Sequence, residues 1–287
     1  MAHLTDEQLC NLEQAACKIR QDIIEMLLEA KSGHSAGPLG MTDVFAVLYL
    51  TDAIRQDPKK PEWEERDRIV LSNGHICPVQ YAAMANAGYF PVEELKTLRK
   101  WGSRLQGHPH KEVLPGIETS SGPLGSGLSQ ACGMAYGFKM DKKKNQVVCL
   151  LGDGELDAGQ NWEAIMWAGK NQMDNLTAIV DRNNIQIDGF TEDIMPLEPL
   201  GAKFESFGWH VLEINGNDIN TIYNALAEAK AIFEKPVCIL AHTIPGKGVD
   251  FMEFDFNWHG KSPNKDEAEK ALMELRSLGG RITSEHE

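Results

Sequence analysis

The sequence predicts an α/β fold in which a parallel β-sheet carries helices on both faces. Residues 147–151 and 176–181 are short apolar runs of the kind that form strands buried on both sides, and residues 163–169 between them have helical spacing. A strand, a helix and a strand within about 30 residues make one βαβ unit. The same alternation of apolar runs and helical segments continues toward the C-terminus, which extends the sheet.

The segment before this unit is predicted to be mainly helical. The residues from Thr5 resemble a capping box, and apolar residues then recur at helical spacing as far as residues 31–33. A second helix is expected to begin at Thr42. A short strand is expected at 69–71, and Pro91 is well placed as the first residue of a further helix because its fixed φ suits that position.

The C-terminal part adds two strands, at 210–214 and 237–241, around a helix at 221–233. An amphipathic helix is expected at 266–278. No internal repeat, low-complexity tract or linker interrupts the pattern. Residues 1–287 are therefore predicted to form a single domain with a full hydrophobic core.

The composition is that of a globular protein and argues against several classes of partner. Hydrophobic residues make up 42% of the chain and charged residues 24%, and no apolar run is long enough to span a bilayer. A net charge of −14 argues against nucleic acid and against an anionic membrane. The six cysteines include no Cys-x-x-Cys pair, so we expect reduced thiols in a cytoplasmic protein, without zinc or disulfides.

Polar residues follow both strands of the βαβ unit. Asp153, between Gly152 and Gly154, comes after the first strand, and Asn183 comes after the second. In a parallel sheet both lie at the carboxyl edge, where ligands bind in open α/β folds. Their oxygens suit Mg²⁺, which adds phosphate oxygens and water, and Gly154 lets the backbone approach an anion closely. The pattern predicts a metal-diphosphate site, although Gly-Asp-Gly is also an ordinary turn sequence.

Histidines occur in several glycine-rich or turn-like segments. An imidazole there is accessible, and it can donate to a phosphate or sugar oxygen or exchange a proton near neutral pH. A single histidine of this kind is most simply an exposed loop residue. Four in a chain with a candidate diphosphate site indicate a functional group of side chains: His34, His75, His108 and His259.

Taken together, these segments resemble the thiamine-diphosphate-binding half of transketolase, in particular the N-terminal subunit of the two-subunit form. The resemblance covers almost the whole chain and implies the diphosphate-binding domain of the thiamine-diphosphate-binding fold. It is carried by the segments at 32–40, 71–75, 107–109, 122–125, 152–155, 183–189 and 258–260.

The resemblance implies two cofactors, thiamine diphosphate and Mg²⁺, with Ca²⁺ or Mn²⁺ as alternatives to Mg²⁺. The implied metal ligands are Asp153, the Asn183 side chain and the Ile185 carbonyl. The implied diphosphate contacts are Gly154 and His75. The implied contacts of the cofactor rings are Gly122, Leu124 and Ile187.

The resemblance also implies a reaction, transfer of a two-carbon ketol unit from a ketose or ketose phosphate to an aldose. His108 corresponds to the histidine that holds the donor's C1 hydroxyl. His34 and His259 correspond to those that move protons at the reacting carbonyl and hydroxyl. The cofactor supplies the carbanion chemistry and the protein orients it.

The sequence departs from the family pattern at two positions. Ser35 follows His34 where transketolases usually have proline, so the backbone there is expected to differ. Ala158 stands where the family usually has a glutamate that joins an acidic network across the subunit interface. Asp157 is one position early, which places the coupling of two active sites in question.

The family also draws an activating glutamate and the groups that grip the substrate's phosphate from a second domain. The chain, which ends at residue 287, is therefore expected to be half of an active site. The implied partner is a C-terminal transketolase subunit with a pyrimidine-binding domain. The chain is expected to form an α2β2 heterotetramer with this partner and to be inactive without it. Its substrates would be sugars or sugar phosphates.

Two other functions fit part of the pattern. A deoxyxylulose-phosphate synthase or a 2-oxoacid dehydrogenase subunit would share the Asp153 and Asn183 element but match the four histidine segments less well. A non-catalytic regulatory homologue would not need these side chains. The sequence leaves open which ketose donor and which aldose acceptor are used.

Overall fold

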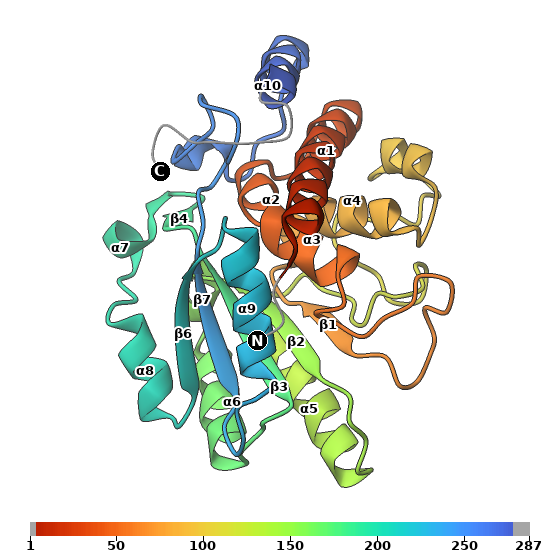
Figure 1. Ribbon diagram of the computed structural model, residues 1–287. Coiled ribbons are helices and arrows are strands. Elements are labelled where there is room, and N and C mark those ends of the chain that lie inside the picture. Colours follow the sequence, from red (N-terminus) through yellow and green to blue (C-terminus); the bar gives the residue numbers. More distant parts are fainter. Residues whose placement is uncertain (1–3, 278–287) are drawn as a thin grey trace.

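The computed structural model describes residues 4–277, and its centre is a five-stranded sheet with all strands parallel (Figure 1). The strand order is β1-β2-β3-β7-β6, which confirms the predicted α/β class. The strands are β1 (Arg68–Leu71), β2 (Val147–Gly152), β3 (Leu176–Arg182), β6 (His210–Asn215) and β7 (Val237–His242). A short antiparallel ribbon follows β3 and consists of β4 (Ile185–Gln186) and β5 (Gly189–Phe190).

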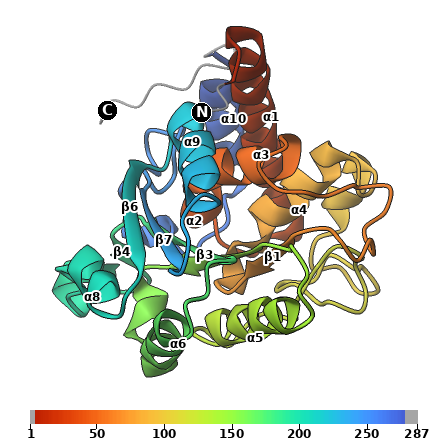
Figure 2. The same cartoon turned by 60° about the horizontal axis from the view of Figure 1, so that its bottom comes forward.

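Helices cover both faces of this sheet (Figure 2). The first face packs against α1 (Asp6–Ala30), α3 (Thr42–Leu50), α4 (Cys77–Ala87) and α9 (Ile219–Ala229). The second packs against α5 (Gly127–Met140), α6 (Gly159–Lys170) and α8 (Leu200–Ser206). The remaining helices are α2 (Ala36–Gly40), α7 (Thr191–Ile194) and α10 (Lys265–Ser277).

The strands read as continuous apolar runs because both of their faces are buried. In β2, Val148 and Leu150 belong to the core on the α1 face, whereas Cys149 and Leu151 belong to the core on the α5 face. All seven residues of β3, the central strand, are buried. This layering fixes the carboxyl ends of β2 and β3 side by side.

The chain's first and last described helices pack together. The Thr5 side chain accepts from the Gln8 amide and the Gln8 side chain accepts from the Thr5 amide, as the predicted capping box requires. The Cys17 thiol on α1 donates to the Leu275 carbonyl on α10 at 3.2 Å. Among the helices of residues 4–277, none has the length and apolar character needed to cross a membrane.

Some helix boundaries differ from those predicted. Pro91 precedes a 3₁₀ helix, Val92–Thr97, and is its N-cap instead of the first residue of an α-helix. The helix predicted at 221–233 begins at Ile219 and ends at Ala229, because the chain must turn before Pro236 to enter β7. Helices α4 and α5 were not predicted from the sequence. Residue 278 of the last predicted helix lies outside the described residues.

Candidate active site

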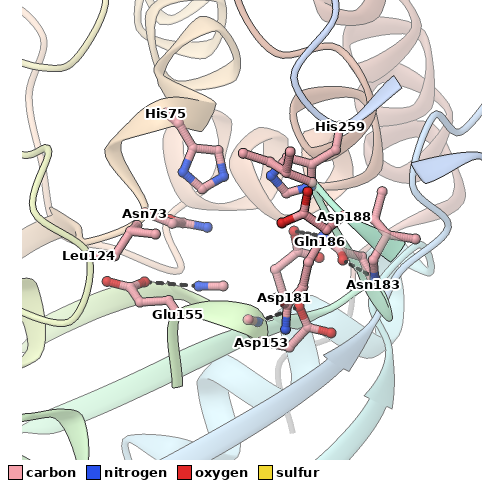
Figure 3. Close-up of a pocket in the computed structure, with 14 residues that line it drawn as sticks. Asn73, His75, Leu124, Asp153, Glu155, Asp181, Asn183, Gln186, Asp188 and His259 are labelled. Carbon is pink, nitrogen blue, oxygen red and sulfur yellow. Dashed lines mark hydrogen bonds between the residues drawn. The ribbon is translucent and has the colours of Figure 1, made fainter. Parts of the chain in front are cut away.

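The carboxyl edge of the sheet brings together two of the three residues predicted as metal ligands. Asp153 directly follows β2 and Asn183 directly follows β3, and these strands are neighbours with Gly152 paired to Asp181. Both side chains line one pocket, together with His75 and His259 (Figure 3).

Asp153 is held by hydrogen bonds to both carboxylate oxygens. Its Oδ1 accepts one, from the Gly154 amide at 2.7 Å. Its Oδ2 accepts three, from the Asn184 amide at 2.8 Å, Arg182 Nη1 at 3.0 Å and the Thr191 hydroxyl at 3.3 Å. Burial raises the pKa of Asp153, while Arg182 and the amide donors act in the opposite direction. Each carboxylate oxygen has about two acceptor sites, so the unused capacity lies on Oδ1.

Asn183 is oriented by Asp181, the buried residue two positions earlier. Asn183 Nδ2 donates to Asp181 Oδ2 at 2.8 Å, and Asn183 Oδ1 accepts from the Ile185 amide at 3.0 Å. Burial raises the pKa of Asp181 to about 7, although the hydrogen bond that Thr243 donates to it acts to lower that pKa. With Nδ2 committed to Asp181, Oδ1 is the atom that can bind a cation. Ile185, at the start of β4, is buried and also lines the pocket.

A glycine-rich segment at 122–127 forms the opposite side of the site. Leu124 lines the pocket and is 43% exposed, whereas Gly122 is not among the lining residues. Glu155 holds this segment to the sheet, because its Oε1 accepts from the Gly125 amide at 2.7 Å and its Oε2 from the Gly152 amide at 3.1 Å. Ile187, in the turn between β4 and β5, lines the pocket and is 65% exposed.

Three of the four predicted histidines form a cluster above the strand ends. The ring centroids of His34 and His75 are 4.8 Å apart, those of His75 and His259 5.4 Å, and those of His34 and His259 5.6 Å. His75 lies in the 3₁₀ helix Gly74–Ile76 that follows β1. His108 lies beside Gly74, because a Cβ built on that glycine would meet His108 Cδ2 at 3.3 Å. Segments far apart in the sequence thus converge on one site.

Burial favours the uncharged form of the imidazoles at this site. Burial lowers the pKa of His34 to about 4, with further lowering from His259 and from Arg99. Burial and the neighbouring imidazoles lower the pKa of His75 well below its usual value. Burial also lowers the pKa of His259 and of His108. A neutral imidazole can accept a proton, as a general base must.

Several polar atoms around the pocket are left without a protein partner. Within residues 4–277, Asn73 Oδ1, His34 Nδ1 and His259 Nδ1 are buried and make no hydrogen bond. Buried polar atoms are normally satisfied, so these fit a site that takes a polar ligand. No group of three or more His, Cys, Asp or Glu residues in that part of the chain could hold a metal. A metal here would therefore need amide and carbonyl oxygens beside Asp153.

The two departures from the family pattern have structural counterparts. The Ser35 hydroxyl donates to the Lys261 carbonyl at 2.6 Å, which ties the His34 segment to the segment that follows His259. Asp157 accepts a hydrogen bond from Gln186 Nε2 at 3.0 Å.

Three residues that shape the site were not predicted from the sequence: Arg182, Glu155 and Asp181. The available signal was a charged side chain at the end of an otherwise apolar strand, or directly after Gly-Asp-Gly. Because such residues are costly to bury without partners, they indicate a polar network.

The comparisons with known proteins agree with this geometry. Residues 12–277 match the family described as transketolase, thiamine diphosphate binding domain. The 6-deoxy-6-sulfo-D-fructose transketolase subunit SqwG of Clostridium sp. (strain MSTE9) is 42% identical over 95% of this chain and 99% of that protein. An apulose-4-phosphate transketolase subunit of Phocaeicola vulgatus is 40% identical over 93% of this chain and 95% of that protein.

Solved structures show the same relationship. The crystal structure of transketolase from Campylobacter jejuni superposes with a TM-score of 0.86 at 34% identity, over 92% of this chain and 42% of that one. The chain thus spans about two fifths of that transketolase but nearly the full length of the two proteins named above. The chain belongs to the transketolase family, as an N-terminal, thiamine diphosphate-binding subunit.

Proposed function

We propose that this chain works with a C-terminal transketolase subunit to transfer a two-carbon ketol unit from a ketose to an aldose, using thiamine diphosphate and Mg²⁺. The observation that carries the proposal is the convergence of three imidazoles on a pocket whose floor holds Asp153 and Asn183. When bound, thiamine diphosphate supplies the carbanion chemistry of such a transfer. The chain's own residues bind and orient the cofactor and the substrate, and they exchange protons with the substrate.

In this proposal the metal ligands are Asp153, Asn183 and the Ile185 carbonyl. Gly154 and His75 contact the diphosphate, and the rings of the cofactor lie against Gly122, Leu124 and Ile187. The exposure of Leu124 and Ile187 supports this assignment, because large apolar side chains at the edge of a pocket suit an apolar ligand or partner. Mg²⁺ is the preferred ion, with Ca²⁺ and Mn²⁺ as alternatives, since all three accept oxygen ligands.

The catalytic residues in this proposal are His34, His108 and His259. His108 holds the C1 hydroxyl of the donor. His34 and His259 pass protons at the reacting carbonyl and hydroxyl, and the burial that lowers the pKa of both, which favours the neutral imidazole, supports that role. Their unpartnered Nδ1 atoms would accept or donate to a bound ligand.

The partner is proposed from the names and lengths of relatives. Two of the similar proteins are named as transketolase subunits, and the chain covers 44% of human transketolase. We infer an α2β2 heterotetramer with a pyrimidine-binding partner, in which this chain forms a single diphosphate-binding domain, and we propose that it is cytoplasmic. Packing of α1 against α10 supports the single domain.

The substrate is proposed to be a ketose that carries a distal anionic group. The two similar proteins are named for 6-deoxy-6-sulfo-D-fructose and for apulose-4-phosphate, so both names describe a sugar with a sulfonate or a phosphate. We expect the residues that bind this group to lie on the partner.

The test is reconstitution with a C-terminal transketolase subunit from the same organism. The pair should cleave ketoses and transfer the ketol unit when thiamine diphosphate and Mg²⁺ are present, and this chain alone should be inactive. Robust activity of the chain alone would refute the need for a partner. Decarboxylation of pyruvate by the pair would favour a related reaction class. If calorimetry on the pair detects no Mg²⁺-dependent binding of the cofactor, a non-catalytic role would be favoured.

A further inference from the structure

Arg182 is the last residue of β3, and its guanidinium is buried at the end of the central strand. Its side chain is 3% exposed. Its Nη1 donates to Asp153 Oδ2 at 3.0 Å, and its Nη2 donates to Glu192 at 2.5 Å and to Glu198 at 3.0 Å. One guanidinium therefore joins a buried aspartate to two glutamates that are 40% and 56% exposed.

The geometry makes the two oxygens of Asp153 different. Oδ2 receives Arg182, the Asn184 amide and the Thr191 hydroxyl, so its lone pairs are fully used. Oδ1 receives the Gly154 amide alone. Arg182 is the charged member of these four donors, so its loss would remove the strongest of the contacts that orient the carboxylate.

The outer contacts keep the guanidinium in place. Glu192 lies in α7, where its Oε1 also accepts from the Leu197 amide at 3.2 Å. Glu198 Oε2 accepts from the Leu200 amide at 2.8 Å. Because both glutamates accept from backbone amides, their contacts restrain the Arg182 guanidinium beside Asp153.

We propose that Arg182 is a positioning residue for the divalent cation of the proposed active site, which it serves by orienting Asp153 so that Oδ1 alone is presented to the metal. This inference rests on the proposed function. A neighbouring cation would by itself repel the metal, so a role in orientation and a role as mere counter-charge predict opposite effects of its removal. Residues that orient metal ligands typically contribute 10- to 100-fold to metal affinity.

The test measures Mn²⁺ binding to the full chain reconstituted with its C-terminal partner subunit and thiamine diphosphate, by the loss of the free Mn²⁺ signal in electron paramagnetic resonance. Arg182→Met should weaken Mn²⁺ binding by about tenfold or more. Glu198→Gln is the matched control, because it removes one outer charge and leaves the contact with Asp153, and it should change the affinity by less than about twofold. Unchanged or tighter binding by folded Arg182→Met would overturn the inference.

A second readout separates orientation from damage to the fold. At saturating Mn²⁺, Arg182→Met should regain the wild-type affinity for thiamine diphosphate, whereas a damaged pocket would not. If Arg182→Met does not fold, Arg182→Lys decides, because lysine keeps the charge but not the planar fork that spans Asp153 and the glutamates. Wild-type affinity in Arg182→Lys would overturn the inference. A reconstituted wild-type pair that binds no Mn²⁺ would instead refute the proposed metal site, and the inference with it.

Discussion

The Ser35 hydroxyl donates a hydrogen bond to the Lys261 carbonyl at 2.6 Å, across 226 residues of sequence. Ser35 adjoins His34, and Lys261 lies two residues after His259. The bond therefore joins the two segments that carry these imidazoles. A proline at position 35 could not make it, so the departure from the family sequence supplies a contact of its own.

Ser35→Ala should loosen this pair of histidines. The Lys261 carbonyl would lose its partner, which should lower the free energy of unfolding by about 1 kcal/mol and reduce kcat of the reconstituted enzyme several-fold. Ser206→Ala is the control, because that exposed hydroxyl donates a hydrogen bond of 2.7 Å to the Lys203 carbonyl within α8, away from the histidines. Urea unfolding and initial rates check both values, and a wild-type kcat in Ser35→Ala would contradict the coupling.

Asp153→Ala should abolish Mg²⁺-dependent binding of thiamine diphosphate and leave the fold intact. The fold should survive because Arg182 keeps Glu192 and Glu198 as partners. Calorimetry gives the affinity, and circular dichroism the fold. Asp188→Asn is the control, since Asp188 lines the same pocket but is not a proposed ligand, and it should keep binding. Full activity in Asp153→Ala would refute the metal assignment.

The histidine cluster should make stability depend on pH. His34 has a folded-state pKa of about 4 against an ordinary value of 6.5, so the unfolded chain takes up a proton at a higher pH than the folded one does. The part of the free energy of unfolding that depends on neutral His34 is therefore fully present above about pH 6.5 and is lost as the pH drops toward about 4. His34 should account for about 2 kcal/mol of that loss.

Urea unfolding at pH 7.5, 5.5 and 4.5 measures the effect. His34→Gln should reduce the fall in stability across this window, because glutamine does not titrate. His110→Gln is the control, since His110 is exposed and lies outside the cluster, and it should leave the fall unchanged. Equal pH profiles for wild type and His34→Gln would contradict the prediction.

Glu155→Ala should weaken both the fold and the cofactor site. The change leaves the Gly125 and Gly152 amides and the Ser72 hydroxyl without their shared acceptor, which should cost about 3 kcal/mol. Glu163→Ala, on an exposed position of α6, should have almost no effect. Thermal unfolding and cofactor affinity test this, and an unchanged cofactor affinity in Glu155→Ala would show that the glycine-rich segment does not need its anchor.

The sheet and the meeting of Asp153 and Asn183 at its carboxyl edge could be predicted because both depend on local patterns. Strands buried on two faces are apolar throughout, and Asp153 and Asn183 follow such strands directly. Helix α5 was harder to recognise, since Gly133 and Gly137 break its pattern on a face that the structure leaves open. The sequence after Pro91 suits the start of an α-helix as well as that of the 3₁₀ helix that forms there, so it does not distinguish the two.

The networks behind the site were not predictable in the same way. Whether Arg182 faces Asp153 depends on the path of the chain after β3, since Asn184 and Thr191 must fold back onto the same carboxylate. Likewise, Glu155 contacts Gly125 only because α5 packs against β2. Such contacts join segments that sequence spacing does not relate.

The strand that ends at the candidate site is the centre of the sheet, paired with β2 on one side and β7 on the other. Central strands exchange their amide hydrogens mainly through global unfolding. A ligand at the end of β3 therefore stabilises the whole chain by mass action instead of protecting one loop. Cofactor and metal should slow hydrogen exchange across all five strands together.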